Sequence, residues 1–211
     1  MITRRKFLTL SCAAILAGAS LTLDGCSGSN SSESSSLKGA KVGDVVKLGT
    51  YPQDSKGTKE PIEWVVIQQD SEGRLLLTTS KVLDCKPYND TDKSDPGWDN
   101  INSCSLKKWL KNDFTQTAFT DAERQKIVKT SLMSEGVCDS YFNDTRCEPT
   151  DYAVAQGVYV DEKNGFCMYW VQGEINAVYF SHPQFEHIMG GEGYKQTYDN
   201  FGVRPTVLIE P

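Results

Sequence analysis

Cysteine is the residue type in this chain with the greatest capacity for chemistry. Seven cysteines occur among 211 residues. Cys104 precedes a predicted helix, and a helix N-terminus can stabilise the thiolate that a nucleophilic cysteine needs. Such a nucleophile also requires a base, and the sequence contains two histidines, His182 and His187, both near its end. The spacing pairs neither histidine with Cys104, so we expect no catalytic residue and keep thiol catalysis as an alternative.

A polar stretch from residue 89 to residue 100 has the composition of a cation-binding loop. It contains four aspartates and two asparagines, and the aspartates are Asp90, Asp92, Asp95 and Asp99. Calcium takes about six to eight oxygen ligands, often from such a loop. The stretch departs from the helix-loop-helix calcium pattern because Lys93 interrupts it and no glutamate closes the ring. We therefore expect a solvated acidic loop and no cofactor or metal, with calcium as the alternative.

Arg204 is a charged residue inside an otherwise apolar segment. It lies between Val203 and Pro205, in a run that we expect to be a strand. An unpaired charge there would be costly, so the sequence predicts a structural ion pair. The candidate partners are Asp44, Glu63 and Asp151, and a contact from Arg204 to a ligand is the alternative.

The overall charge excludes one class of partner. The formal charge is −6 and the isoelectric point is near 5.0. Neutralising nucleic-acid phosphates requires clustered lysine and arginine. We therefore expect no nucleic-acid partner.

The first 25 residues have the pattern of a secretory signal peptide. Arg4, Arg5 and Lys6 precede an uncharged apolar run over 7–23, which is too short and too diluted with small polar residues for a membrane span. The run ends in Leu23-Asp24-Gly25-Cys26, which resembles the bacterial lipobox. Residues 3–8 resemble the twin-arginine export consensus. These resemblances imply a bacterial lipoprotein anchored by lipid on Cys26, palmitate included, at the extracytoplasmic face of the cell membrane.

Removing the signal peptide simplifies the cysteine count. Cys12 leaves with the leader and Cys26 goes to lipid, so five cysteines remain in a mature chain of net charge −8. Outside the cytoplasm these thiols can form disulfides. We expect one bridge among Cys138, Cys147 and Cys167, and a bridge between Cys85 and Cys104 is also open. The odd number predicts at least one free thiol, and the absence of a CxxC unit does not favour zinc.

The domain organisation follows from composition. Residues 26–41 contain the lipidated cysteine and a serine-rich stretch that predicts a flexible tether. Residues 42–211 have the composition of a folded domain, long enough to bury a single core.

Short elements of both kinds are predicted within that domain. The predicted strands cover 45–48, 62–67, 75–79, 167–171, 175–180 and 203–209, with a hairpin turn at Glu72-Gly73. Apolar spacing predicts a helix over 105–114, a capping box at Thr120 and Glu123 starts a second, and Thr150 starts a third. Strands at both ends with helices between them indicate an α+β fold whose terminal strands could pair. We expect the large aromatics, including Trp64, Trp109 and Trp170, to be core residues rather than a sugar-stacking platform.

A series of short motifs then carries a family resemblance. In chain order they are Val42-Gly43-Asp44, Gly49-Thr50-Tyr51-Pro52, Pro61-Ile62-Glu63-Trp64, Leu106-Lys107-Lys108-Trp109-Leu110, Pro149-Thr150-Asp151-Tyr152 and Gly202-Val203-Arg204-Pro205. This order resembles a bacterial surface family catalogued as domain of unknown function six-two-seven-three. That family usually has a W-W-L-R-S-P-G segment, whereas this chain has Tyr169-Trp170-Val171-Gln172-Gly173-Glu174. Any role of that arginine in relatives is therefore absent here.

The terminal motif also suggests a broader fold. It is similar to signatures of the fold shared by C-type lectins and the formylglycine-generating enzyme, which implies a single lectin-like α+β domain with long loops. We therefore expect a surface-displayed lipoprotein with a non-enzymatic lectin-like domain that binds glycan or protein ligands. The alternative is a cell-envelope enzyme, or an enzyme accessory, that uses a thiol or the acidic loop.

Overall fold

The computed structural model describes residues 37–90, 104–173, 178–191 and 197–211. The chain divides into two units, Met1–Glu33 and Ser34–Pro211, and every described residue belongs to the second. This unit has the predicted α+β class. Among the described residues, no helix combines the length and apolar character that a membrane span requires.

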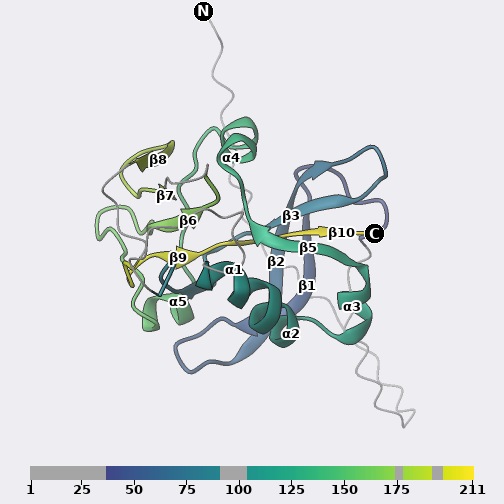
Figure 1. Ribbon diagram of the computed structural model, residues 1–211, viewed down its shortest axis with the longest axis horizontal. Coiled ribbons are helices and arrows are strands. Elements are labelled where there is room, and N and C mark those ends of the chain that lie inside the picture. The colour runs from purple at the N-terminus through teal and green to yellow at the C-terminus, as the bar shows by residue number, and fades with distance from the viewer. Residues whose placement is uncertain (1–36, 91–103, 174–177, 192–196) are drawn as a thin grey trace, which may run out of the picture. The chain divides into compact units, whose positions relative to one another are not determined.

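The strands in the described ranges form two sheets (Figure 1). The first has the order β1-β2-β3-β10-β5 and the second the order β4-β9-β6-β7-β8. The bounds are β1 (Val45–Pro52), β2 (Lys59–Gln69), β3 (Leu75–Thr79), β4 (Asp84–Cys85), β5 (Ile127–Leu132), β6 (Tyr169–Val171), β7 (Val178–Ser181), β8 (Ile188–Gly191), β9 (Gly202–Val203) and β10 (Pro205–Ile209).

The first sheet is antiparallel throughout. The predicted turn at Gly73 joins β2 and β3, and its φ of 81° is an angle that glycine adopts readily. Strand β10 lies between β3 and β5. The first and last strands of the chain therefore share a sheet, but they are separated by β2 and β3 rather than paired with each other.

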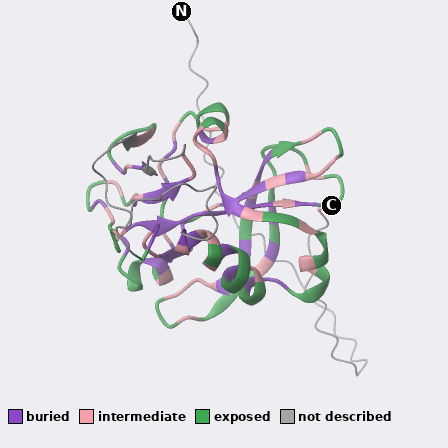
Figure 2. Cartoon of the chain, in the orientation of Figure 1, coloured by how far each residue is buried: buried purple, intermediate pink, exposed green. Residues whose placement is uncertain are grey.

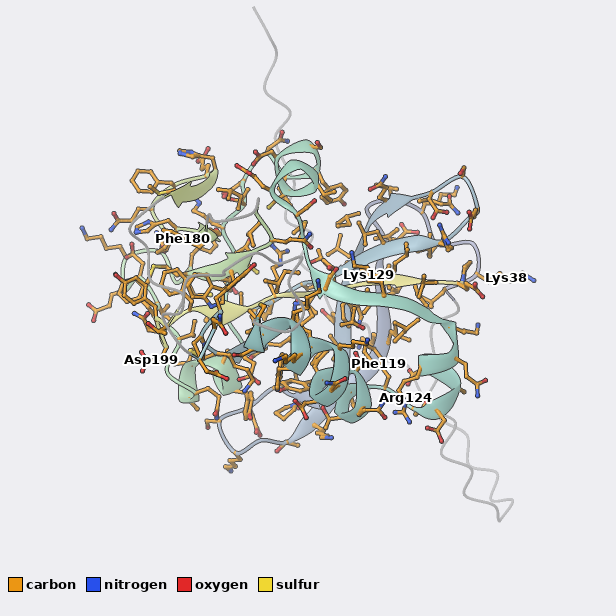
Figure 3. All side chains as sticks on the ribbon, viewed as in Figure 1. Lys38, Phe119, Arg124, Lys129, Phe180 and Asp199 are labelled. Carbon is orange, nitrogen blue, oxygen red and sulfur yellow. The ribbon has the colours of Figure 1, made fainter. Side chains whose placement is uncertain are left out.

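The helices of the described residues lie between β4 and β6 in the sequence. They are α1 (Ser105–Trp109), a π-helical turn η1 (Leu110–Phe114), α2 (Thr115–Ala118), α3 (Asp121–Lys126), α4 (Glu135–Tyr141) and α5 (Asp151–Ala155). The predicted helix at 105–114 thus continues to Ala118. The capping box of Thr120 and Glu123 is confirmed, and Thr150 caps α5 by accepting from the Ala153 N–H. Arg124 of α3 donates to the Phe119 carbonyl oxygen (Figure 3).

The main core lies where the first sheet, the α1–α2 segment and the second sheet meet. Trp64 and Trp170 are fully buried there, as predicted, whereas Trp109 is only partly buried. The Trp170 ring stacks on Phe201 at 4.1 Å between centroids. Figure 2 shows buried residues in strands of both sheets, while helix α3 contributes none. Two smaller clusters, one around Tyr169 and one around Met133, extend the core.

One residue joins the two sheets. Strand β9 belongs to the second sheet and β10 to the first, and Arg204 is the single residue between them. Figure 1 shows the two strands as one continuous yellow ribbon that crosses from sheet to sheet. Gly202 permits this crossing, because an added Cβ would lie 2.3 Å from Val82 Cγ1.

Candidate functional site

The crossing buries the Arg204 side chain between elements of both sheets. Its Nε donates to the Thr79 carbonyl at the end of β3, at 3.0 Å, and its Nη1 donates to the Tyr169 hydroxyl of β6, at 3.1 Å. The guanidinium also lies over two aromatic rings, with Cζ 4.9 Å from the Phe142 centroid and 5.4 Å from that of Tyr169. Only 5% of the residue is exposed.

The predicted ion pair of Arg204 does not form with any of the three candidate partners. Within the described residues no carboxylate lies within 4.0 Å of its guanidinium. Of the expected partners, Glu63 pairs with Lys47 at 3.7 Å and Asp44 accepts the Lys41 backbone N–H. Asp151 starts helix α5. The guanidinium instead donates to the Thr79 carbonyl and to the Tyr169 hydroxyl of the second sheet.

The groups nearest to Arg204 are uncharged at neutral pH. Burial raises the pKa of Tyr169, and burial also raises the pKa values of Cys138 and Cys147. For Arg204, burial acts to lower the pKa, but the neighbouring Cys147 and Tyr169 raise it, and the net shift is upward. The guanidinium therefore keeps its proton while its neighbours keep theirs, so it has no formal counter-charge among them.

The contacts of Arg204 return an energy of the same order as the cost of burying it, but none of them is to an anion. Removing an ion from water costs several kcal/mol even after relaxation, on the order of 5 kcal/mol. A cation–π contact returns about 0.5–2 kcal/mol and a hydrogen bond to a charged group about 1.5–3 kcal/mol. Two such bonds and two ring contacts hold the cation, but none supplies negative charge.

A cavity of about 550 Å³ is lined in part by Arg204. Its walls come from β1, β2, the segment after β3 and the segment that leads into α5. The residues that contribute charge are Lys47, Glu60, Glu63, Lys81, Arg146, Glu148 and Asp151. The volume lies within the range of about 300–1,000 Å³ that is typical of ligand sites.

Most of the charges on the wall neutralise one another. Lys47 pairs with Glu63, and Lys81 pairs with Glu148, each at 3.7 Å. Arg146 pairs with Asp144 at 2.6 Å and also with Glu186. In the part of the chain that the structure describes, Glu60 and Asp151 form no ion pair. Apart from Arg204, the residues that line the cavity therefore carry a small excess of negative charge.

Three buried hydroxyls near Arg204 lack a hydrogen-bond partner among the described residues. They are Thr79 Oγ1, Ser80 Oγ and Thr145 Oγ1. The Thr79 carbonyl accepts from Arg204, Ser80 lines the cavity, and the Thr145 carbonyl accepts from the Tyr169 hydroxyl. Buried polar groups without partners are uncommon in folded proteins. These three hydroxyls therefore mark polar positions on the segments that hold Arg204 and Tyr169 or line the cavity.

The expected disulfides are absent from the structure, which corrects that prediction. All five cysteines among the described residues, Cys85, Cys104, Cys138, Cys147 and Cys167, are buried free thiols. Cys85 and Cys104 lie in different core clusters, and Cys138 lies in a third. Four of the thiols donate to backbone carbonyls, such as Cys85 to Asp199 at 3.1 Å and Cys167 to Cys147 at 3.4 Å. The thiols therefore serve as buried weak donors.

Cys104 does not have the surroundings of an activated nucleophile. It precedes α1 as predicted, but it is fully buried and its Sγ donates toward the Tyr88 carbonyl at 3.5 Å. Burial raises its pKa, whereas a nucleophilic cysteine needs a lowered one. His182 instead contacts Phe180 and Phe185. The structure therefore shows neither an activated Cys104 nor a contact between Cys104 and His182.

The predicted acidic loop lies largely outside the described residues. Asp92, Asp95 and Asp99 are not described, and the described Asp90 donates its backbone N–H to Ser105 Oγ at 3.0 Å. Among the described residues, no group of three or more His, Cys, Asp or Glu side chains could hold a metal ion.

Sequence reasoning found the central residue of the site but not its surroundings. Arg204 was conspicuous because it interrupts an apolar strand. Ser80, Arg146 and Tyr169 gave no comparable signal, since each lies in a separate segment and the tertiary fold alone brings them to Arg204.

Comparison with known proteins gives one match. Residues 72–138 match the model of a family described as a domain of unknown function, DUF6273. The matched segment runs from the β2–β3 turn into α4 and does not include Arg204. Neither a curated protein nor a solved structure matches the chain. The match supports the predicted resemblance over that segment and assigns no activity.

Proposed function

We propose that this chain is a surface-displayed bacterial lipoprotein with a non-enzymatic ligand-binding domain. In this proposal residues 1–25 are a signal peptide, lipid on Cys26 anchors the chain, and residues 26–41 lift the domain from the membrane. The motif at Leu23-Asp24-Gly25-Cys26 and the pair Arg4-Arg5 support it. The domain then faces ligands outside the cytoplasmic membrane.

One observation carries the binding function. The cavity of about 550 Å³ is lined in part by Arg204, a buried residue that forms no ion pair among the described residues. Structural charges are normally paired, and a buried cation next to an open cavity is typical of a site that orients a ligand. The volume suits a ligand the size of one or two sugar rings or a short peptide segment. A glycan is the ligand class that the lectin-like resemblance favours.

The enzymatic alternative receives less support. Cys147 is the thiol on the cavity wall, but burial raises its pKa, so it is protonated at neutral pH. No histidine lines this cavity within the described residues. A thiol-based reaction would need both a thiolate and a proton acceptor at the site.

Two measurements test the proposal. Metabolic labelling with palmitate in a bacterial host should mark the full chain, and Cys26→Ser should abolish the label, whereas Cys85→Ser should retain it. Glycan arrays probed with the purified full chain should show binding that Arg204→Gln removes. A chain that is never lipidated contradicts the anchor, and binding that is unaffected by Arg204→Gln contradicts the assigned site.

A further inference from the structure

The Arg204 guanidinium has hydrogen-bonding capacity that the protein does not use. Nε and Nη1 each make one bond, and Nη2 has no hydrogen-bond partner among the described residues. A guanidinium presents further N–H groups in a planar fork. Arg204 is also one of the residues that line the cavity.

We propose that the cavity recognises its ligand through a carboxylate, which pairs with Arg204. This proposal rests on the ligand-binding function proposed above and specifies its chemistry. The planar fork of arginine matches the two oxygens of a carboxylate, and a pair of charge-assisted hydrogen bonds fixes their orientation. The ligand would supply the negative charge that the contacts of Arg204 lack.

The wall of the cavity favours a singly charged group over a doubly charged one. Glu60 and Asp151 line it without an ion pair among the described residues, so a dianion such as phosphate would meet more repulsion. A carboxylate carries one charge and would place it against the Arg204 guanidinium. The remainder of the ligand then faces a wall of paired charges, where hydroxyl or amide groups can form hydrogen bonds.

The hydroxyl of Ser80 supplies a second anchor. Its Oγ is buried without a hydrogen-bond partner among the described residues, and it lines the same cavity as Arg204. The adjoining Thr79 carbonyl holds Arg204 Nε, so Ser80 and the guanidinium are fixed by one segment of chain. A hydroxyl rotates freely and can donate to an oxygen of the bound carboxylate.

Matched probe pairs test this proposal by titration calorimetry on the purified full chain. Glucuronate is compared with glucuronamide, and acetyl-alanyl-alanine with its C-terminal amide, so that a sugar acid and a peptide carboxylate are distinguished. In at least one pair we expect the acid to bind about tenfold more tightly than the amide, because charge-assisted bonds are stronger. Inorganic phosphate should bind more weakly than that acid.

Two variants, each with a control, test whether a preference for the acid arises at this site. Arg204→Gln should remove the difference between acid and amide, and Arg124→Gln, at an arginine that does not line the cavity, should preserve it. If Arg204→Gln does not fold, Ser80→Leu provides the test, because it adds an apolar side chain to the cavity lining and retains the arginine. Ser71→Leu, at an exposed turn, is its control. Loss of acid binding in Ser80→Leu but not in Ser71→Leu supports the proposal.

Other outcomes overturn it. Equal binding of acid and amide, tighter binding of phosphate, or a preference that survives Arg204→Gln or Ser80→Leu would each contradict the carboxylate assignment. Neutral glycans that bind in an Arg204-dependent manner without preferring an acid would retain the proposed function and reject only this inference. Absence of binding by every acid probe would also reject it.

Discussion

The Nη1 of Arg204 donates to the hydroxyl of Tyr169 across 3.1 Å, and this bond ties the start of β10 in the first sheet to β6 in the second. The same hydroxyl donates to the Thr145 carbonyl. Tyr169 therefore holds both the cation and the segment that leads to the cavity wall. Removing its hydroxyl leaves Arg204 Nη1 without its partner, while the Thr145 carbonyl still accepts from Ser181 Oγ at 3.2 Å.

Tyr169→Phe should destabilise the domain by about 1–3 kcal/mol, the usual cost of leaving buried polar groups unsatisfied. Urea unfolding of the purified chain, followed by tryptophan fluorescence, measures it. Tyr159→Phe is the control, because Tyr159 is 42% exposed and its loss of a hydroxyl should change stability little. Equal effects of the two substitutions would contradict the structural role of Tyr169.

Gly202→Ala should destabilise the domain by about 1–3 kcal/mol through overpacking. The added Cβ would lie 2.3 Å from Val82 Cγ1 and 3.1 Å from the Met168 carbonyl oxygen. Gly136→Ala is the matched control: it lies in α4 with open space around it, so alanine should be neutral or should stabilise by up to about 1 kcal/mol. Thermal unfolding of both variants provides the comparison, and a harmless Gly202→Ala would show that the crossing has room to spare.

Thr120→Ala should cost about 0.5–2 kcal/mol, because it removes the hydroxyl that accepts from the Glu123 backbone N–H in the capping box. Thr120→Ser keeps that oxygen and should restore most of the loss. Chemical denaturation measures both variants. A serine variant as unstable as the alanine variant would mean that the methyl group, not the cap, matters.

The buried thiols should resist modification in the native protein. After unfolding without reductant, labelling should modify all five of Cys85, Cys104, Cys138, Cys147 and Cys167, whereas native labelling at neutral pH should be slow. Mass spectrometry of labelled peptides gives the count. Any pair that labels only after reduction would identify a disulfide and contradict the free thiols seen here.

Alkaline pH should weaken the fold through the same thiols. Burial raises the pKa of Cys85 to about 12 and that of Cys138 to about 11, from an ordinary value of 9.0. Between the ordinary pKa of 9.0 and the raised pKa of each thiol, the unfolded chain has lost protons that the folded chain retains, so stability falls as pH rises. The stability that the protonated thiols contribute is fully present below pH 9.0 and is lost as pH rises through 11 to 12. Denaturation series over this range for the parent and for Cys138→Ala should show a smaller fall in the variant.

The sequence by itself determined the local elements. Strand β3, the Gly73 turn, the capping box and the Thr150 cap were all predictable, because each depends on side chains within a few residues of one another. The α+β class followed from their order. Strand β5 was not predicted, because its residues 127–132 lack a clear alternation and its pairing with β10 fixes it.

Only the tertiary structure decided the site. The sequence marked Arg204 as unusual, but a charge in an apolar strand can pair with any carboxylate that the fold brings near. The crossing from β9 to β10 placed its guanidinium against Tyr169, Phe142 and Thr79, and it forms no ion pair with Asp44, Glu63 or Asp151. These contacts join segments more than 30 residues apart, and the electrostatics of a buried group depend on such neighbours rather than on its own type.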